Sequence, residues 1–424
     1  MNLKPVPNIE PTTRTCFKCK SSFTSYLNSN AYSIVCPKCG TVYSIYNNVI
    51  DKSTDLVKTP REGVDLPMGT SGTIKGIRYL VTGYMRKNEN GTNYHWDEYT
   101  LFNPVHGVAY LSQYDGHWMF LKELTGLPST EEKVARFEGI QYDLYSRYRS
   151  KLKTASGEFI YQLSSTETAY VEEYINPPEM LSKERTADNI TWYKGEYIQP
   201  EDIKSGFEVL TVPARKGVGM IQPFMAKFNS DVFRQLVILL IVFWGLSQLY
   251  FLQSASEEIV FQQDFNISDS TNKKEIFSKS FDLKHGLSNA EVKLNTNVSN
   301  NWMYCAVTLV NEKTGDLYNV DLEAEYYFGY EGGESWTEGS NWVSKVVSSV
   351  PEGRYYLIIY SEKPTSMKNA YITVSVTRDV YIFSNGLIVL ILLLAYPVFY
   401  FYRKNAFEKK RWYNSNYSPY DDED

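Results

Sequence analysis

The sequence predicts a mainly β protein with several domains and two transmembrane helices. The 424 residues include 35 Tyr and 21 Phe, and such aromatic content is typical of strands and half-buried sheet surfaces. Two uncharged apolar runs are long enough to cross a bilayer. Four of the five cysteines lie in two close pairs near the N-terminus. At roughly 100–200 residues per domain, the chain has room for two to four folded units.

Residues 1–50 are predicted to form a zinc ribbon. Cys16 and Cys19 form one C-x₂-C pair, and Cys36 and Cys39 form a second pair. Two residues between cysteines let a tight turn aim both thiolates at one ion, and Gly40 permits the backbone conformation that closes the second turn. Paired spacing of this kind indicates a metal site in a reducing compartment. We expect a closed, structural Zn²⁺ site, with iron as the alternative that thiolates also accept.

Two apolar segments are predicted to span a membrane, at residues 232–253 and 381–402. Their apolar parts, residues 236–252 and 382–402, contain no charged side chain, whereas a core helix of a soluble protein normally shows a polar stripe. Lys and Arg precede the first run and follow the second, and acidic residues follow the first. The positive-inside rule therefore predicts that both termini are cytosolic and that residues 254–380 lie outside.

Residues 66–207 are predicted to form a cytosolic, small β-barrel-like domain, because short strands alternate there with Gly and Asn. We expect linkers before and after it, at residues 51–65 and 208–231. The run Gly76-Ile-Arg-Tyr79 recurs as Gly139-Ile-Gln-Tyr142. This repeat favours two similar β units packed together, although Tyr-rich strands also resemble one another by chance.

This domain contains several short motifs of aromatic, acidic and glycine residues. The motif residues are Trp96, Glu98, Tyr99, Trp118, Gly157, Glu158 and Phe159. These motifs resemble those of a bacterial family, domain of unknown function 4178. The resemblance extends to the zinc ribbon and indicates a membrane-bound subgroup with two spans and an acidic tail. It implies a role in envelope or membrane maintenance, and it assigns no role to the motif residues.

The same domain contains candidate catalytic groups, three carboxylates and three histidines. They are Glu98, Glu158, Glu196, His95, His106 and His117. Carboxylates beside aromatic residues at strand ends usually accept hydrogen bonds from the backbone, and no nucleophile–base pair or known ligand spacing is visible. We therefore expect no enzymatic activity, and a hydrolase is the alternative.

Residues 254–380 are predicted to form an extracytoplasmic antiparallel β-sandwich, because apolar and polar residues alternate along several segments. A segment rich in Gly, Glu and Trp is a candidate ligand loop for a sugar, a peptide or a cation, although a tight β-crossover needs the same residue types. Its candidate residues are Glu331, Glu334, Trp336, Glu338 and Trp342.

The tail, residues 403–424, is basic and then acidic, and we expect it to be disordered. The net charge of −6 argues against general nucleic-acid binding. The function we expect is a non-enzymatic scaffold or sensor of the bacterial inner membrane, in contact with the lipid bilayer and with protein partners on both sides. Two alternatives remain: an accessory subunit of a channel or transporter, and a membrane-tethered nucleic-acid binder that uses Lys18, Lys20 and Lys38. The sequence leaves the oligomeric state open.

Overall fold

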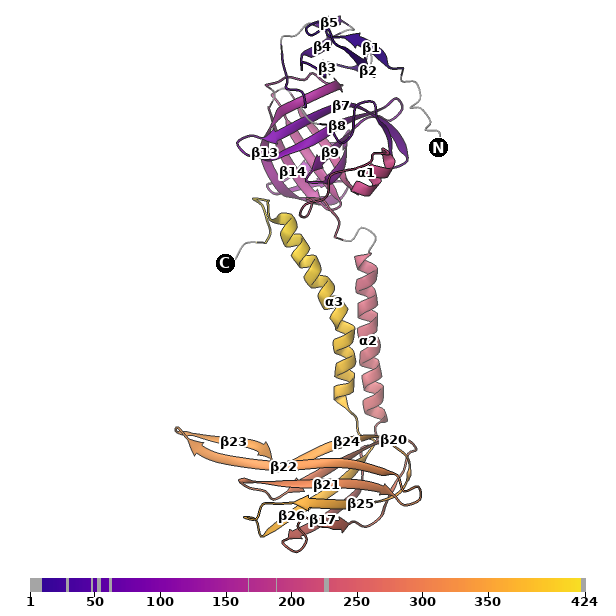
Figure 1. Cartoon of the computed structure of the whole chain (residues 1–424), viewed down its shortest axis with the longest axis vertical. Coiled ribbons are helices and arrows are strands. Elements are labelled where there is room, and N and C mark those ends of the chain that lie inside the picture. The colour runs from indigo at the N-terminus through magenta and orange to yellow at the C-terminus, as the bar shows by residue number, and fades with distance from the viewer. Residues whose placement is uncertain are drawn as a thin grey trace. The chain divides into compact units, whose positions relative to one another are not determined.

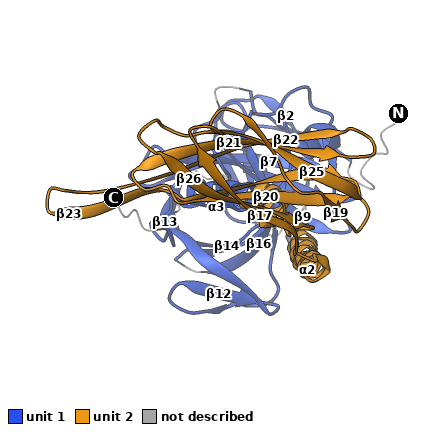
Figure 2. Cartoon of the chain, turned by 90° about the horizontal axis from the view of Figure 1, so that it is seen from below, with its two compact units in different colours: residues 1–228, 399–424 blue, residues 229–398 orange. Residues whose placement is uncertain are grey.

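The structure is a computed structural model of the chain, and it confirms a mainly β fold (Figure 1). It describes residues 10–27, 30–46, 49–51, 55–60, 63–166, 168–187, 189–224 and 229–420. The chain divides into two compact units (Figure 2). Unit 1 comprises Met1–Phe228 and Phe399–Asp424, and unit 2 comprises Asn229–Val398.

Unit 1 contains the ribbon strands, the strands of a barrel and one short helix. The ribbon strands are β1 Thr12–Thr15, β2 Ser22–Ser25, β3 Ser33–Val35, β4 Val42–Tyr46 and β5 Val49–Asp51. The strands that follow are β6 Ser71–Ile74, β7 Ile77–Glu89, β8 His95–Asn103, β9 Gly107–Tyr114, β10 His117–Glu123, β11 Ser129–Thr130, β12 Val134–Phe137, β13 Ile140–Phe159, β14 Thr168–Asn176, β15 Glu179–Arg185 and β16 Ile190–Ile198. Helix α1 comprises Pro200–Gly206.

Eight antiparallel strands close into a barrel in the order β13-β14-β15-β16-β10-β9-β8-β7, and β7 pairs with β13 to complete the ring. Closure depends on the length of β13, which has 20 residues. Its residues 143–151 pair with β14, and its residues 152–157 pair with β7. The small β-barrel predicted between residues 66 and 207 is confirmed.

The sequence repeat corresponds to two similar halves of this barrel. Each half is a four-stranded meander, β7 to β10 and β13 to β16, and each begins with a two-residue hairpin turn. Lys75 and Gly76 form the first turn, with φ of 51° and 78°, and Glu138 and Gly139 form the second, with φ of 52° and 78°. Positive φ at both central residues is the mark of a type I′ turn. The two halves close one barrel instead of folding as separate units.

The ribbon is continuous with the barrel sheet, which the sequence did not predict. Strand β3 pairs with the last three residues of β13, so the order β5-β4-β3-β13 extends the barrel sheet into the ribbon. The expected linker at residues 51–65 is also partly packed. Val57 is buried with Val35 and Val42, and Lys58 forms a parallel bridge with Thr154.

Unit 2 contains the predicted β-sandwich. One sheet has the order β17-β26-β20-β24, and the other has the order β18-β25-β21-β22-β23, with β19 paired to β25. These strands are β17 Glu258–Ser268, β18 Glu275–Phe277, β19 Phe281–Leu283, β20 Ser288–Thr296, β21 Asn301–Asn311, β22 Leu317–Glu331, β23 Glu334–Ser340, β24 Trp342–Val350, β25 Gly353–Glu362 and β26 Asn369–Arg378. Alternate residues of both sheets form one apolar core, as the alternating sequence pattern predicts.

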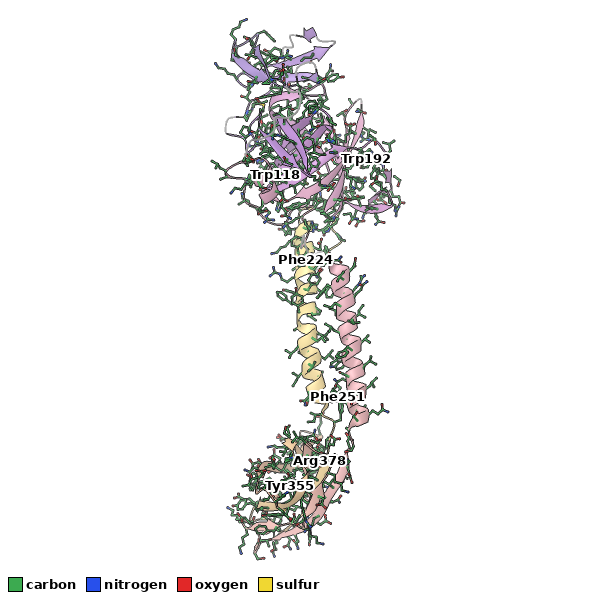
Figure 3. All side chains as sticks on the ribbon, turned by 90° about the vertical axis from the view of Figure 1, so that its right-hand side faces the viewer. Trp118, Trp192, Phe224, Phe251, Tyr355 and Arg378 are labelled. Carbon is green, nitrogen blue, oxygen red and sulfur yellow. The ribbon has the colours of Figure 1, made fainter. Side chains whose placement is uncertain are left out.

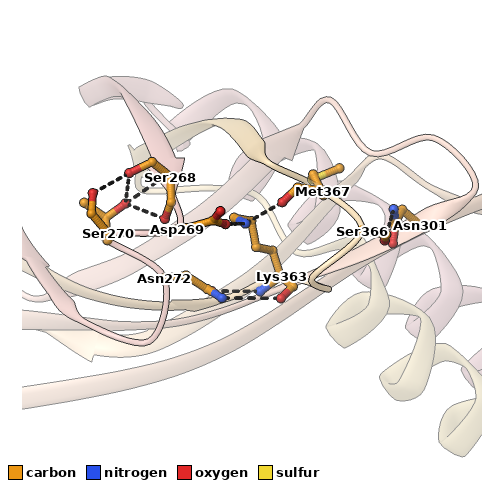
Figure 4. A network of polar contacts seen from close by, with 9 residues as sticks. Ser268, Asp269, Ser270, Asn272, Asn301, Lys363, Ser366 and Met367 are labelled. Atoms are coloured by element: carbon orange, nitrogen blue, oxygen red, sulfur yellow. Dashed lines mark hydrogen bonds and ion pairs between the residues drawn. The ribbon is translucent and has the colours of Figure 1, made fainter.

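Two buried cations stabilise the loops of the sandwich. Arg378, labelled in Figure 3, is fully buried, and its guanidinium group donates hydrogen bonds to five backbone carbonyls, those of Lys284, Gly286, Ser288, Asn289 and Val350. The second cation is Lys363, whose ammonium group donates to Asp269 at 2.6 Å and to the carbonyl of Met367 (Figure 4). Both groups are satisfied by hydrogen bonds, as buried charges require.

Two helices are long and apolar enough to cross a membrane, judged by length and composition. They are α2, Ser230–Ser254, and α3, Phe383–Trp412. Within unit 2 they contact each other: the indole nitrogen of Trp244 donates to the carbonyl of Gly386 at 2.9 Å. Helix α3 contains Pro397, which removes one backbone hydrogen bond at the boundary between the two units.

Candidate metal centre and barrel interior

The four paired cysteines converge as the spacing predicts. Their sulfur atoms lie within 4.8 Å of one another, with 3.6 Å between Cys16 and Cys39 and 3.8 Å between Cys19 and Cys36. Four sulfurs placed tetrahedrally about 2.3 Å from one ion are about 3.8 Å apart. The cluster can therefore bind a metal ion without large rearrangement.

Two similar turns build the cluster. In the turn between β1 and β2, the amide of Lys20 donates to the carbonyl of Cys16, and in the turn between β3 and β4, the amide of Gly40 donates to the carbonyl of Cys36. Gly40 has φ of 68°. A Cβ atom there would lie 1.7 Å from the carbonyl oxygen of Val57. Only glycine fits this position, as predicted.

Burial and hydrogen bonds shift the pKa values of Cys16 and Cys36 in opposite directions. Burial opposes ionisation of Cys16, but donors from the Cys19 backbone and the Tyr43 hydroxyl outweigh it and lower the pKa of Cys16 to about 6. Burial raises the pKa of Cys36 to about 11. Ser21 and Thr41 place hydroxyls 3.0 Å and 3.1 Å from the sulfurs of Cys19 and Cys39. This polar support around thiolate ligands is typical of protein metal sites.

Glu158 connects the ribbon to the barrel. Its side chain is buried at the end of β13. One carboxylate oxygen accepts a hydrogen bond from the Ser25 hydroxyl, and the other accepts the amides of Tyr26 and Leu27 at 2.6 Å and 2.7 Å. Beside it, Gly157 pairs with both β3 and β7. The role of Glu158 is therefore to satisfy backbone donors of the ribbon, which is the role expected for carboxylates at strand ends.

The barrel has an unusual distribution of polarity. The outward side chains of β7 to β10, among them Tyr99, Leu101 and Trp118, form an apolar layer. This layer packs against α1 and the residues beside it, including Phe207. Tyr99 and Trp118 stack with ring centroids 5.7 Å apart. The inward side chains instead surround a cavity of about 400 Å³ and include several carboxylates and tyrosines. The largest apolar cluster of this unit thus lies outside the barrel wall, whereas Met85, Leu163 and Met180 of two smaller clusters line the cavity.

One lysine and two glutamates form an ion-pair network inside the barrel. The ammonium group of Lys87 lies 3.0 Å from Glu98 and 3.5 Å from Glu184. Burial disfavours the charge on Lys87, but the two carboxylates outweigh it and raise the pKa of Lys87 well above its usual range. The indole nitrogen of Trp96 donates to Glu98 at 2.6 Å. Trp96 and Glu98, two of the motif residues, therefore both face the barrel interior.

A further glutamate in the cavity has polar neighbours but no cation. Glu173 accepts hydrogen bonds from Ser146 at 2.5 Å and from Tyr148 at 3.0 Å. Burial raises the pKa of Glu173, and the two hydrogen bonds only partly oppose this. Among the described residues, no Lys or Arg pairs with Glu173.

Comparison with known families identifies this part of the chain. Residues 67–200 match the family described as "Domain of unknown function (DUF4178)". The segment is a DUF4178 domain. No curated protein matches the chain. The match covers the barrel and confirms the family predicted from its motifs, and it does not extend to the ribbon or to the two long helices.

The solved structures that match this chain have low sequence identity and low TM-scores. A structure of infectious bursal disease virus Gt strain is 9% identical, covers 83% of this chain and 70% of its own, and has a TM-score of 0.16. The Cry4Aa toxin from Bacillus thuringiensis is 7% identical, covers 72% of this chain and 52% of its own, and also has a TM-score of 0.16. These values are too low to indicate a common fold.

The candidate catalytic groups of the DUF4178 domain do not converge. Glu98 faces the barrel interior, Glu158 contacts the ribbon, and Glu196 pairs with Lys75 on the surface. His117 is buried between the Tyr197 hydroxyl and the carbonyl of Lys216. His95 and His106 are exposed. The lysines proposed as phosphate contacts, Lys18, Lys20 and Lys38, are exposed on the two cysteine turns.

The C-terminal end of α3 packs against the DUF4178 barrel within unit 1. The side chain of Arg411 is buried and donates to the carbonyls of Gly219, Met220 and Gln222 at 2.6–3.1 Å. The Tyr145 hydroxyl of β13 donates to the carbonyl of Arg411 at 2.9 Å. This end of α3 is thus held by both the barrel wall and the segment that precedes α2.

The disorder expected for the C-terminal tail is therefore wrong. We expected disorder over residues 403–424, but α3 continues to Trp412, whose ring lies 5.3 Å from that of Tyr145, and Ser415 donates to the Tyr145 carbonyl. Residues 421–424 lie outside the described residues. The expected linker at 208–231 is partly packed too, because its residues 219–222 accept the hydrogen bonds from Arg411. The residues in both contacts are far apart in the sequence, so no local sequence pattern predicts the contacts.

The candidate ligand loop of the sandwich is a regular hairpin. Strands β22 and β23 pair up to Glu331 and Glu334, next to the turn. Glu338 is exposed, and the indole of Trp336 covers Gly329, where a Cβ atom would lie 2.8 Å from the ring. Trp342 begins β24 and lies 4.6 Å from the ammonium group of Lys293. Four of the five candidate residues thus lie along the β22–β23 hairpin and Trp342 lies in the other sheet, so they do not converge on one pocket.

Proposed function

We propose that this chain is a non-enzymatic scaffold or sensor of a bacterial inner membrane. In this proposal α2 and α3 cross the bilayer, the ribbon and the DUF4178 barrel lie in the cytosol, and the sandwich lies outside. Apolar side chains are exposed along both helices, and a bilayer would cover them. The Lys and Arg residues that flank the two spans agree with this orientation.

The attachment of α3 to the barrel is the observation that carries the proposal. Helix α3 is continuous from Phe383 to Trp412, and its last turn is fixed to the DUF4178 domain through Arg411. Packed interiors resist deformation and transmit strain. A movement of the C-terminal end of α3 would therefore reach the barrel directly, which is what a sensor of events outside the membrane requires.

We propose that the four-cysteine cluster holds zinc with a structural role. A closed set of four thiolates is the usual structural zinc site, and it leaves no open position for a substrate. The ribbon is small, and a metal compensates for the limited core of such modules. The zinc would stabilise the part of the ribbon whose backbone donates hydrogen bonds to Glu158 of the barrel.

A pull-down tests the scaffold proposal. Full-length protein, and a variant that lacks residues 259–380, would be purified from the native membrane in mild detergent, and their partners identified by mass spectrometry. We expect the full chain to retain specific partners and the variant to lose those that bind the sandwich. If neither the full chain nor the variant retains a specific partner, the scaffold role is contradicted.

A further inference from the structure

The interior of the DUF4178 barrel has the properties of a ligand-binding site. Eight-stranded barrels are wide enough either to be filled by side chains or to hold one small ligand. This barrel retains a cavity of about 400 Å³, which falls within the range of ligand pockets, about 300–1,000 Å³. The largest apolar cluster of this unit lies outside the wall, and the cavity itself is lined by carboxylates and tyrosines together with apolar residues such as Met85 and Met180.

The charges inside the barrel favour a cation. Lys87 is the one cation among the described side chains that line the cavity, and it already pairs with Glu98 and Glu184. Glu123 and Glu173 also line the cavity, and among the described residues no Lys or Arg pairs with Glu173. A buried carboxylate without a positive partner is costly. The interior is therefore short of positive charge, and a bound cation would supply it.

The aromatic lining favours an organic cation. Tyr110, Tyr148, Tyr161 and Tyr193 line the same cavity as Trp96. Aromatic faces attract ammonium groups and also contact the carbon atoms beside them. A hard metal ion would need oxygen ligands in a compact shell, which this wide aromatic cavity does not offer.

We propose that the interior of the DUF4178 barrel binds a small organic ammonium ion. Its ammonium group lies against Glu173, and its carbon skeleton lies among the tyrosines. The ligand enters where the cavity continues into a wider one of about 920 Å³, which shares Trp96 and Glu173 with it and is bordered by residues 216–221 and by Lys410. The proposal concerns the barrel alone and is independent of the membrane orientation.

Three probes with the same carbon chain test the proposal. Full-length protein in detergent would be titrated by calorimetry with hexylamine, hexan-1-ol and hexanoate. We expect hexylamine to bind at one site, and the neutral and anionic probes to bind at least about tenfold more weakly, since a hydrogen bond between two charged groups is stronger than one between neutral groups. Equal binding of all three probes, or no binding of hexylamine, would overturn the proposal.

Two neighbouring glutamates provide a matched pair of variants. Glu173 faces the cavity, whereas Glu172 pairs with Arg147 and Lys183 on the other face of β14. We expect Glu173→Gln to weaken hexylamine binding about tenfold or more and Glu172→Gln to leave it unchanged. Circular dichroism checks that both variants fold. If Glu173→Gln does not fold, Tyr193→Leu should weaken binding instead, and equal affinity of the folded variants and the wild type would refute the site.

Discussion

Replacing Cys36 with serine should remove the bound metal and unfold the ribbon. Cys36 is fully buried, and its sulfur lies 3.8 Å from that of Cys19. A serine hydroxyl is a poor ligand for zinc, so the site loses one of its four donors. Structural zinc contributes about 10–16 kcal/mol to the folding of zinc-finger peptides, which makes this the largest effect that we expect from one substitution.

Elemental analysis and hydrogen exchange measure the result. The wild type should contain one zinc ion per chain, and the Cys36→Ser variant should contain none and lose protection across β3 and β4. The control is Cys305→Ala, because Cys305 is buried in the sandwich core and should leave the zinc content unchanged. Iron in the wild type, or full zinc occupancy in Cys36→Ser, would contradict a structural zinc site.

Replacing Arg411 with leucine should release the end of α3 from the DUF4178 barrel. The substitution removes the donors to the carbonyls of Gly219, Met220 and Gln222, and it leaves Glu408 without its cation. Removing one partner of a buried ion pair costs about 3–5 kcal/mol. Amide exchange near residue 220 and across the last turn of α3 should therefore accelerate about a hundredfold or more.

The control for this variant lies on the same helix. Lys409 is exposed, so Lys409→Leu should change exchange near residue 220 by little, as surface substitutions usually do. Tryptic cleavage after Lys404 gives a second measure, and we expect it to be faster in Arg411→Leu alone. Unchanged exchange and cleavage in Arg411→Leu would mean that the span is not coupled to the barrel.

Features with a local sequence signal could be predicted. The cysteine turns follow from two-residue spacing and from Gly40, and the two long helices follow from uninterrupted apolar runs. The sandwich follows from alternating residues, because one face of each of its strands packs on a single core. In all of these, the pattern within a few residues determines the structure.

Features that depend on distant residues could not be predicted. The bonds from Glu158 to the ribbon join residues more than 130 positions apart, and the contacts of Arg411 span about 190 positions. Alternation along a strand shows which residues share a face, but not whether that face lies inside or outside a barrel. The polar cavity depends on the pairing of β7 with β13, which no local sequence pattern indicates.

Cysteine labelling in intact cells tests the membrane-anchored arrangement most directly. Thr337→Cys places a thiol on the exposed hairpin of unit 2, and Ser129→Cys places one on the exposed surface of unit 1. A maleimide that cannot cross membranes should label Thr337→Cys in spheroplasts, and it should label Ser129→Cys only after the membrane is permeabilised. Labelling of Ser129→Cys in sealed spheroplasts, or protection of Thr337→Cys, would contradict the proposed orientation.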